Sequence, residues 1–271
     1  VKEGSDDFQS DLDLIFDALE NPDKYKTDEA GKNEQFKELN LIDLAKSAKP
    51  ASKYMCLKYY KDFKKAAGDT AKFSANVTLA CDVVLPGNLT IEVDKSMTLT
   101  LNGVVSGTGN LTKTGAGNLR LVNAANTYDG STTVSAGSLY YTTIANIGEA
   151  SSLGRPTSAA NAAITLAGAN LYMIDQSNKA YETDRPVSMN SSSYFYVGTL
   201  TGTAGQSASS TITLTGPFAG MPRIRGRGTL AIRSHLGSAI TGDITRTDAG
   251  TTELLNPTNS STRNVLISDG V

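Results

Sequence analysis

Three arginines alternate with other residues in the segment 221–228, where Arg223, Arg225 and Arg227 stand two apart. In an extended strand, residues two apart point to the same side, and Arg233 follows shortly after. Guanidinium groups bind sulfate, carboxylate and phosphate groups through paired hydrogen bonds. We therefore predict a binding site here for anionic glycans or for lipopolysaccharide phosphates. The alternative is a solvated face whose charges prevent edge-to-edge pairing of strands.

Two other groups of residues have types that occur in catalytic sites. Enzymes that hydrolyse polysaccharides bring acids together in a groove, and the segment with Asp175, Glu182, Asp184 and Arg185 supplies acids and a basic side chain. A loop of solvated charges explains the same cluster. The single histidine, His235, has no neighbouring nucleophile–base–acid pattern, and we interpret it as a surface residue. With one His and two Cys in the chain, most zinc sites and catalytic triads are disfavoured, and we predict no metal or cofactor.

The overall charge and hydropathy exclude some classes of partner. The 271 residues carry 25 Lys and Arg against 27 Asp and Glu, for a net charge of −2. A dedicated nucleic-acid binder usually has a clear basic excess, so we expect no nucleic-acid partner. No apolar run approaches the ~18–20 residues of a membrane helix, so no transmembrane segment is predicted. The chain opens with Val1 rather than methionine, which indicates a processed product or a recombinant piece.

Charge and glycine divide the chain into two unlike parts, with a predicted domain boundary near 68–71. Residues 1–70 hold 12 Lys and Arg and 15 Asp and Glu, but only three of the 25 glycines. Apolar residues recur there at helical spacing, which predicts three short helices: one before Pro22, a second over 33–48 and a third over 52–67. Helices this short need a packing partner. We expect this N-terminal block to act as a cap or as a site for a protein partner.

The composition of residues 71–271 predicts strands. Thr, Val, Ile and Leu are enriched there, and Gly, Asn and Asp interrupt them every few residues. No convincing amphipathic helix follows residue 70, which argues against α/β folds and leaves a sandwich, a barrel or a β-solenoid. The clearest predicted strand regions are 71–85, 89–101, 111–122 and 131–141.

An internal repeat favours the solenoid among these folds. Residues 111–138 align with residues 244–271 without a gap, and nine of the 28 positions are identical. Both copies have asparagines at matching turn positions, where side-chain amides can hydrogen-bond between stacked coils. These asparagines are Asn123, Asn126, Asn256 and Asn259.

Two neighbouring segments carry a family resemblance. Residues 101–119 are LNGVVSGTGNLTKTGAGNL, and residues 126–139 are NTYDGSTTVSAGSL. They resemble the autotransporter-associated β-strand repeat of Gram-negative type V secretion passengers, with one repeat at about 101–139 and a second, truncated one at about 244–271. The resemblance implies a mainly β protein, a parallel right-handed β-helix (solenoid) over 71–271 after the small α-helical block. It also implies a cell-surface or secreted location, with outer-membrane attachment through a C-terminal barrel outside this chain.

On this basis we expect a surface-exposed or secreted passenger segment that acts as a stalk or adhesin and is not an enzyme. Two alternatives stay open, namely a β-helix enzyme that degrades polysaccharides and a self-assembling extracellular fibre subunit. The expected partners are host or microbial glycans at the arginines and a protein partner at residues 1–70. Export to an oxidising compartment favours a disulfide between Cys56 and Cys81, and the alternative is two unpaired thiols.

Overall fold

The computed structural model describes residues 70–271 with gaps at 86, 175–177, 199–209, 235–238, 249, 257–264 and 268–271. The chain divides into two units, Val1–Lys65 and Ala66–Val271, and every described residue belongs to the second unit. The N-terminal helices and the boundary near 68–71 therefore stay predictions. Four residues singled out from the sequence also lie outside the described part: Cys56, Asp175, His235 and Asn259.

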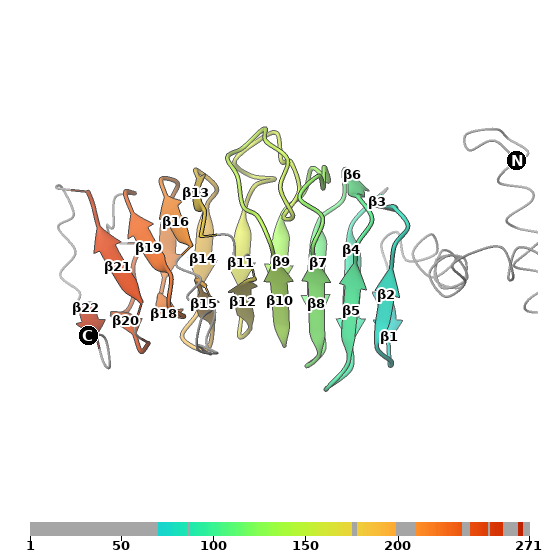
Figure 1. The fold of residues 1–271 in the computed structure, drawn as a ribbon, viewed down its shortest axis with the longest axis horizontal. Coiled ribbons are helices and arrows are strands. Elements are labelled where there is room, and N and C mark those ends of the chain that lie inside the picture. The colour runs from blue at the N-terminus through green and yellow to red at the C-terminus, as the bar shows by residue number, and fades with distance from the viewer. Residues whose placement is uncertain are drawn as a thin grey trace, which may run out of the picture. The chain divides into compact units, whose positions relative to one another are not determined.

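The described residues form 22 short strands and no helix (Figure 1). The seven-stranded sheet contains, in spatial order, β1 (Thr70–Phe73), β4 (Leu89–Val93), β7 (Leu111–Thr114), β9 (Thr132–Val134), β11 (Ile164–Leu166), β14 (Val187–Met189) and β17 (Phe218–Gly220). The nine-stranded sheet contains β2 (Val77–Leu79), β5 (Thr98–Leu101), β8 (Asn118–Leu121), β10 (Ser138–Tyr141), β12 (Asn170–Met173), β15 (Tyr194–Tyr196), β18 (Arg223–Arg225), β20 (Ile244–Arg246) and β22 (Val265–Ile267). A two-stranded sheet pairs β3 (Val83–Leu85) with β6 (Val105–Gly107), and a four-stranded sheet contains β13 (Ala180–Thr183), β16 (Thr211–Leu214), β19 (Thr229–Ile232) and β21 (Thr251–Leu254).

The chain coils through these sheets in turn, so each of the two large sheets gains a strand with nearly every turn. Leu89 pairs with Leu111, which lies 22 residues further along the chain. All pairs of described strands are parallel. Two coils are longer: Thr132 to Ile164 spans 32 residues, because the segment 142–163 is inserted, and Val187 to Phe218 spans 31. About eight turns result. The predicted parallel β-solenoid is thus confirmed, and the sandwich and the barrel are excluded.

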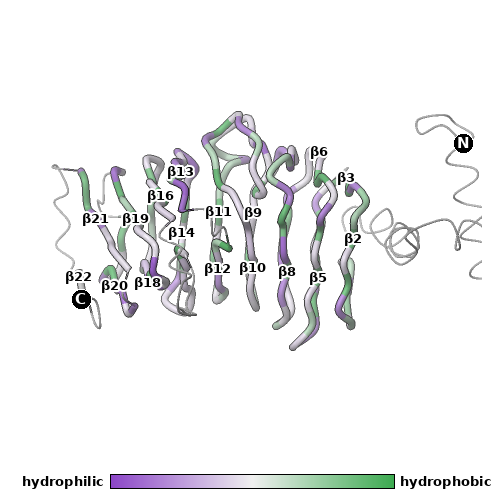
Figure 2. The backbone as a smooth tube through the Cα atoms, in the orientation of Figure 1, coloured by the Kyte–Doolittle hydropathy of each residue, from purple (hydrophilic) through white to green (hydrophobic). Residues whose placement is uncertain are grey.

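The interior is built from apolar residues, which alternate with outward-facing residues along most strands. Figure 2 shows the hydrophobic and hydrophilic stretches along the backbone. In β5, Leu99 and Leu101 are buried, while Thr98 and Thr100 are half-exposed. Because parallel strands pair in register, buried positions of successive coils stack into rows. One such row in the nine-stranded sheet is at most 3% exposed, and it consists of Val77, Leu99, Leu119, Leu139, Leu171, Phe195 and Ile224.

Asparagines at the corners join neighbouring coils, as the sequence predicts. The fully buried Asn126 accepts a hydrogen bond from the Val105 amide at 2.8 Å and donates one to the Ser152 carbonyl at 2.9 Å. It therefore links three successive coils through backbone groups that no strand partner satisfies. Asn123 and Asn256 likewise donate to carbonyls of the preceding coil, at 3.0 Å and 3.1 Å. These amides are part of what holds the stack together where the sheets are interrupted.

The two repeat copies keep their strand spacing but lie on different faces of the solenoid. The first copy forms β7, β8 and β9, which begin at residues 111, 118 and 132. The second forms β20, β21 and β22, which begin at residues 244, 251 and 265. The matched strands β7 and β20 belong to the seven-stranded and the nine-stranded sheet, respectively. The repeat therefore specifies a strand–turn–strand unit rather than a fixed position around the solenoid.

Candidate binding face on the nine-stranded sheet

The outer surface of the nine-stranded sheet carries a row of tyrosines with an arginine at each end. In-register pairing places Arg120 of β8 beside Tyr140 of β10. Tyr172 of β12, Tyr196 of β15 and Arg225 of β18 then follow in the same row. Two further outward residues, one on β15 and one on β18, lie beside this row. We define the tyrosine–arginine strip by all seven residues: Arg120, Tyr140, Tyr172, Tyr194, Tyr196, Arg223 and Arg225.

Three of the four tyrosine rings of the strip stack face to face along the solenoid axis, and the fourth, Tyr194, is tilted against Tyr196. The ring centroids of Tyr140 and Tyr172 are 4.7 Å apart with an interplanar angle of 11°, and those of Tyr172 and Tyr196 are 3.9 Å apart with an angle of 14°. Adjacent strands lie about 4.8 Å apart, which is within the range of stacked aromatic rings. The backbone pairing itself therefore favours the stack. Tyr196 is only 4% exposed although it points outward, because its neighbours cover it.

The arginines lie over ring faces of the same strip. The Arg120 guanidinium is 5.6 Å from the centroid of the Tyr140 ring at one end. At the other end, Arg223 and Arg225 are 4.3 Å and 5.7 Å from the centroid of the Tyr194 ring. Such contacts are attractive because the ring face carries partial negative charge. Since rings and guanidinium groups cover one another's faces, the strip offers ring edges, hydroxyl groups and N–H donors to a ligand.

The strip is rich in hydrogen-bond donors at neutral pH. Guanidinium groups only donate, whereas a protonated tyrosine hydroxyl both donates and accepts. Burial raises the pKa of Tyr172, and a hydrogen bond with Tyr196 raises it further. The Tyr172 hydroxyl therefore stays protonated under physiological conditions. This arrangement suits a ligand with many oxygen acceptors and negative charges.

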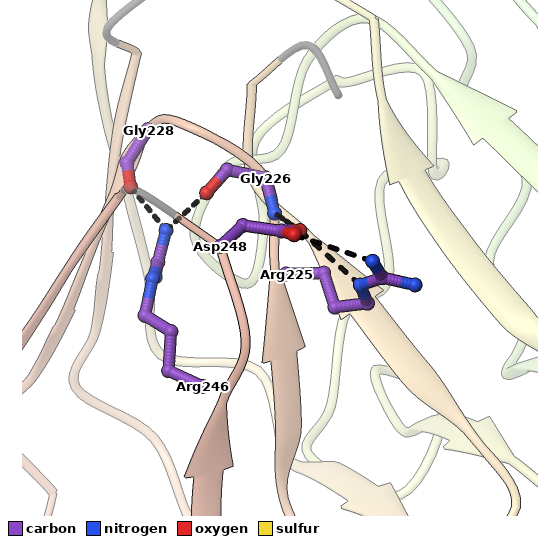
Figure 3. A network of polar contacts seen from close by, with 5 residues as sticks. All are labelled: Arg225, Gly226, Gly228, Arg246 and Asp248. Atoms are coloured by element: carbon purple, nitrogen blue, oxygen red, sulfur yellow. Dashed lines mark hydrogen bonds and ion pairs between the residues drawn. The ribbon is translucent and has the colours of Figure 1, made fainter. Parts of the chain in front are cut away.

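Two adjacent coils fix the position of Arg225 (Figure 3). Its Nε and Nη2 atoms each lie 3.2 Å from a carboxylate oxygen of Asp248, which also accepts the Gly226 amide at 2.8 Å. Burial alone raises the pKa of Asp248, but the Gly226 amide and Arg225 outweigh it and hold this pKa below its usual value. The turn after β18 is held from the next coil as well, because the buried Arg246 at the end of β20 donates to the carbonyls of Gly226 and Gly228. Arg225 is therefore anchored through its guanidinium group, with 35% of its side chain exposed.

The structure separates the four arginines predicted to form one site. Arg223 and Arg225 lie on β18, but the strand ends at Arg225. Gly226 follows with φ of +92°, so Arg227 lies exposed in the turn and not on the strand face. The expectation that three alternating arginines share one strand is wrong for Arg227. Arg233 follows β19 of the four-stranded sheet, where it lies 3.8 Å from Glu182 of β13.

The described members of the predicted acidic cluster make separate structural contacts. Glu182 faces Arg233, and Asp184 accepts the Ile147 amide at 2.7 Å. The buried Arg185 donates to the Ala162 carbonyl at 2.9 Å and to the Leu153 carbonyl at 2.6 Å, which braces the inserted segment 142–163. Within the described ranges these residues therefore stabilise loops and do not converge on a common groove.

Neither a three-ligand metal cluster nor a membrane-spanning helix occurs among the described residues. No group of three or more His, Cys, Asp or Glu side chains lies close enough to hold a metal ion in the part of the chain that the structure covers. In that same part, no helix has the length and apolar character needed to cross a membrane. Cys81 belongs to the described residues, but Cys56 does not, so the disulfide between them stays a prediction.

The tyrosines of the strip were not predicted from the sequence. Tyr140, Tyr172 and Tyr196 stand 32 and 24 residues apart, because the intervening coils differ in length. No regular period therefore marks them. One local signal was present, since each follows a buried apolar residue of an alternating strand and must point outward.

Known proteins share the repeat but cover little of the chain. Residues 111–140 match the family Passenger-associated-transport-repeat. The chain is 36% identical over 75 residues to "Adhesin BmaC autotransporter" of Brucella suis biovar 1 (strain 1330), a stretch that is 28% of this chain and 2% of that protein. No solved structure matches the chain significantly. These matches agree with the resemblance found at 101–139, and passengers of this family are located at the cell surface or outside the cell. The chain therefore carries an autotransporter passenger repeat.

Proposed function

We propose that the solenoid is a non-enzymatic stalk and adhesive surface within the passenger of a larger exported protein. The observation that carries this proposal is the continuous stack of parallel coils. In such a stack each coil pairs with the one before it, so the structure grows in one direction and stays stiff along its axis. It also presents equivalent outward positions in coil after coil. The passenger repeat and the adhesin relative support a surface role.

The finer features of the predicted architecture belong to the same proposal. The solenoid is right-handed, as connections between parallel strands of one sheet nearly always are. A C-terminal barrel outside this chain anchors it in the outer membrane. The helical block at residues 1–70 covers the first coil, because an uncovered sheet edge invites aggregation, or binds a protein partner. Host or microbial glycans are the proposed ligands of the outer surface.

Surface display tests the adhesive role directly. The full chain would be fused to an unrelated outer-membrane anchor and displayed on bacteria that do not adhere by themselves. Attachment to epithelial monolayers would be counted against bacteria that display the anchor alone at equal density. We expect a several-fold gain in attachment. Equal counts for the two strains would contradict an adhesive role.

A second assay tests the non-enzymatic part of the proposal. The purified chain would be incubated with polysaccharides that bind it in affinity chromatography. The release of reducing ends or unsaturated sugars would be followed over a day. We expect no release above a heat-treated sample. Time-dependent release would instead favour the alternative of a polysaccharide-degrading enzyme.

A further inference from the structure

Positive charge gathers on one outer face of the solenoid. From β2 to β20, the outward positions of the nine-stranded sheet include Arg120, Arg223 and Arg225 and otherwise hold Thr, Ser, Asn and Tyr. None of these outward strand positions is a carboxylate. Asp248 lies in the turn after β20 and compensates Arg225, so the excess rests chiefly on Arg120 and Arg223.

The other two large faces differ from this one. On the seven-stranded sheet, Lys72 is neutralised by Glu92, whose carboxylate lies 2.8 Å from its Nζ. On the four-stranded sheet, one outward row holds Glu182 and Glu253, in register through β16 and β19. Arg233 compensates Glu182, which leaves Glu253 on this face. A polyanion is therefore attracted to the nine-stranded sheet rather than to either of the other two.

The spacing of the cations selects a long ligand over a small one. Arg120 of β8 and Arg223 of β18, which carry the excess charge, lie four strand spacings apart across the sheet, which is roughly 19 Å at 4.8 Å per strand. The tyrosine stack fills the distance between them. A single sulfate or a monosaccharide reaches one end of the strip, whereas a chain that lies across the strands, along the solenoid axis, reaches both ends. Two linked contacts bind more tightly than either alone.

The covered ring faces indicate what the ligand chain must carry. A neutral sugar commonly binds by laying its ring on an open aromatic face, but the stacked rings and guanidinium groups occupy these faces in the strip. The groups left for contact are hydroxyls and guanidinium N–H donors, which pair best with anionic oxygens. We propose that the tyrosine–arginine strip binds a linear polysaccharide bearing sulfate or carboxylate groups. The inference rests on the proposed function, since it names the ligand class of that adhesive surface.

The test uses the full chain, immobilised, with heparin as sulfated probe, hyaluronan as carboxylated probe and dextran as neutral control. We expect binding of heparin or hyaluronan that weakens steeply with salt, and no binding of dextran. Arg120→Gln should lower the affinity roughly tenfold, as the loss of one charge-assisted contact does. The matched control is Arg233→Gln, which removes the same charge from an exposed arginine beside the four-stranded sheet. Its affinity should stay within about twofold of the unchanged chain.

Two additional measurements separate the strip from general charge attraction. Heparin fragments shorter than the strip should bind far more weakly than long chains, and Arg120→Gln should remove most of the advantage of length. Tyr172→Phe keeps the ring stack and removes one hydroxyl, so it should weaken binding less than Arg120→Gln. Thermal unfolding of each variant checks that the half-exposed Arg120 was replaced without loss of the fold.

Three outcomes would overturn the inference: equal losses for Arg120→Gln and Arg233→Gln, no dependence on fragment length, or tighter binding to anionic phospholipid vesicles than to either polysaccharide. Cell attachment distinguishes this failure from failure of the proposed function. If the displayed chain promotes attachment and Arg120→Gln leaves attachment unchanged, the adhesive role stands and the polysaccharide strip does not. If the displayed chain promotes no attachment but binds heparin through Arg120, the polysaccharide strip stands and the adhesive role does not.

Discussion

Replacing Asn126 with alanine should weaken the solenoid at one corner by an amount that can be worked out from its contacts. The side-chain amide accepts the Val105 amide at 2.8 Å from the preceding coil and donates to the Ser152 carbonyl at 2.9 Å in the next one. Asn126 is fully buried, and so is Ser152. Truncation at Cβ leaves both backbone groups buried without the partner that they have in the native corner.

The magnitude follows from the cost of two unsatisfied groups. A buried donor or acceptor that loses its partner costs about 1–3 kcal/mol. A water molecule that enters the vacated space recovers part of this cost. We therefore expect the free energy of unfolding to fall by about 2–4 kcal/mol, which is a large fraction of the roughly 5–15 kcal/mol typical of a domain.

Asn123 provides a matched control in the same turn. Its amide donates to the Asn102 carbonyl at 3.0 Å and accepts the Ala125 amide at 2.9 Å, so it makes the same number of hydrogen bonds to the backbone. Asn123 is half-exposed, however, and water can replace its amide after truncation. Asn123→Ala should cost less than about 1 kcal/mol.

Urea unfolding of the full chain, followed by far-ultraviolet circular dichroism, gives the free energies by linear extrapolation. Hydrogen exchange of the Val105 amide adds a local readout, because a repeat structure can open at one corner without complete unfolding. Similar losses for Asn126→Ala and Asn123→Ala would refute the argument, since they would show that burial does not set the cost. Unchanged exchange at Val105 in Asn126→Ala would refute the assigned contact.

Two further predictions concern a buried cation and a close backbone approach. Burial lowers the pKa of Lys113 to about 8 from 10.5. Between these two pH values the unfolded chain therefore binds more protons than the folded chain. The free energy of unfolding should accordingly rise by about 2 kcal/mol from pH 7 to pH 9.5. In urea titrations at both pH values, Lys113→Met should lack this rise, and equal pH profiles would contradict the linkage. A Cβ on Gly109 overlaps the Gly87 carbonyl, whereas a Cβ on Gly87 has nothing within 4 Å. In thermal scans, Gly109→Ala should lower Tm by several degrees and Gly87→Ala should barely change it, and the opposite order would contradict the close approach.

The solenoid could be predicted because strand-forming segments and an internal repeat are visible in the sequence, but the positions of its corners could not be predicted. The single predicted strand region 71–85 is three strands, β1 to β3, and the region 89–101 is two strands, β4 and β5. Alternation of inward and outward residues largely continues around the corners, so it marks the core face without marking where one strand ends. The turn asparagines were the better guide, since Asn126 does lie at a corner and bonds across coils.

The binding face was only partly predictable for a related reason. Arg223 and Arg225 were found because two residues of one strand share a side. Arg227 was misplaced because alternation in the sequence continues past the strand, while the backbone turns at Gly226 with φ of +92°. The tyrosine stack depends on which residues of different coils become neighbours. That register is set by loop lengths such as the insertion 142–163, which a single strand pattern does not contain.

The matched cations Lys113 and Arg246 show what the repeat encodes. They occupy equivalent positions of the two copies, on different sheets, and are 0% and 1% exposed. Lys113 donates to the Gly115 carbonyl at 2.8 Å, and Arg246 donates to the carbonyls of Gly226 and Gly228. At these corners turn carbonyls point inward, and one donor-only side chain satisfies several of them at once, which no apolar residue can do. The basic position of the repeat thus stabilises a turn, whereas Arg120 and Arg223 of the tyrosine–arginine strip are half-exposed, so a ligand can reach them.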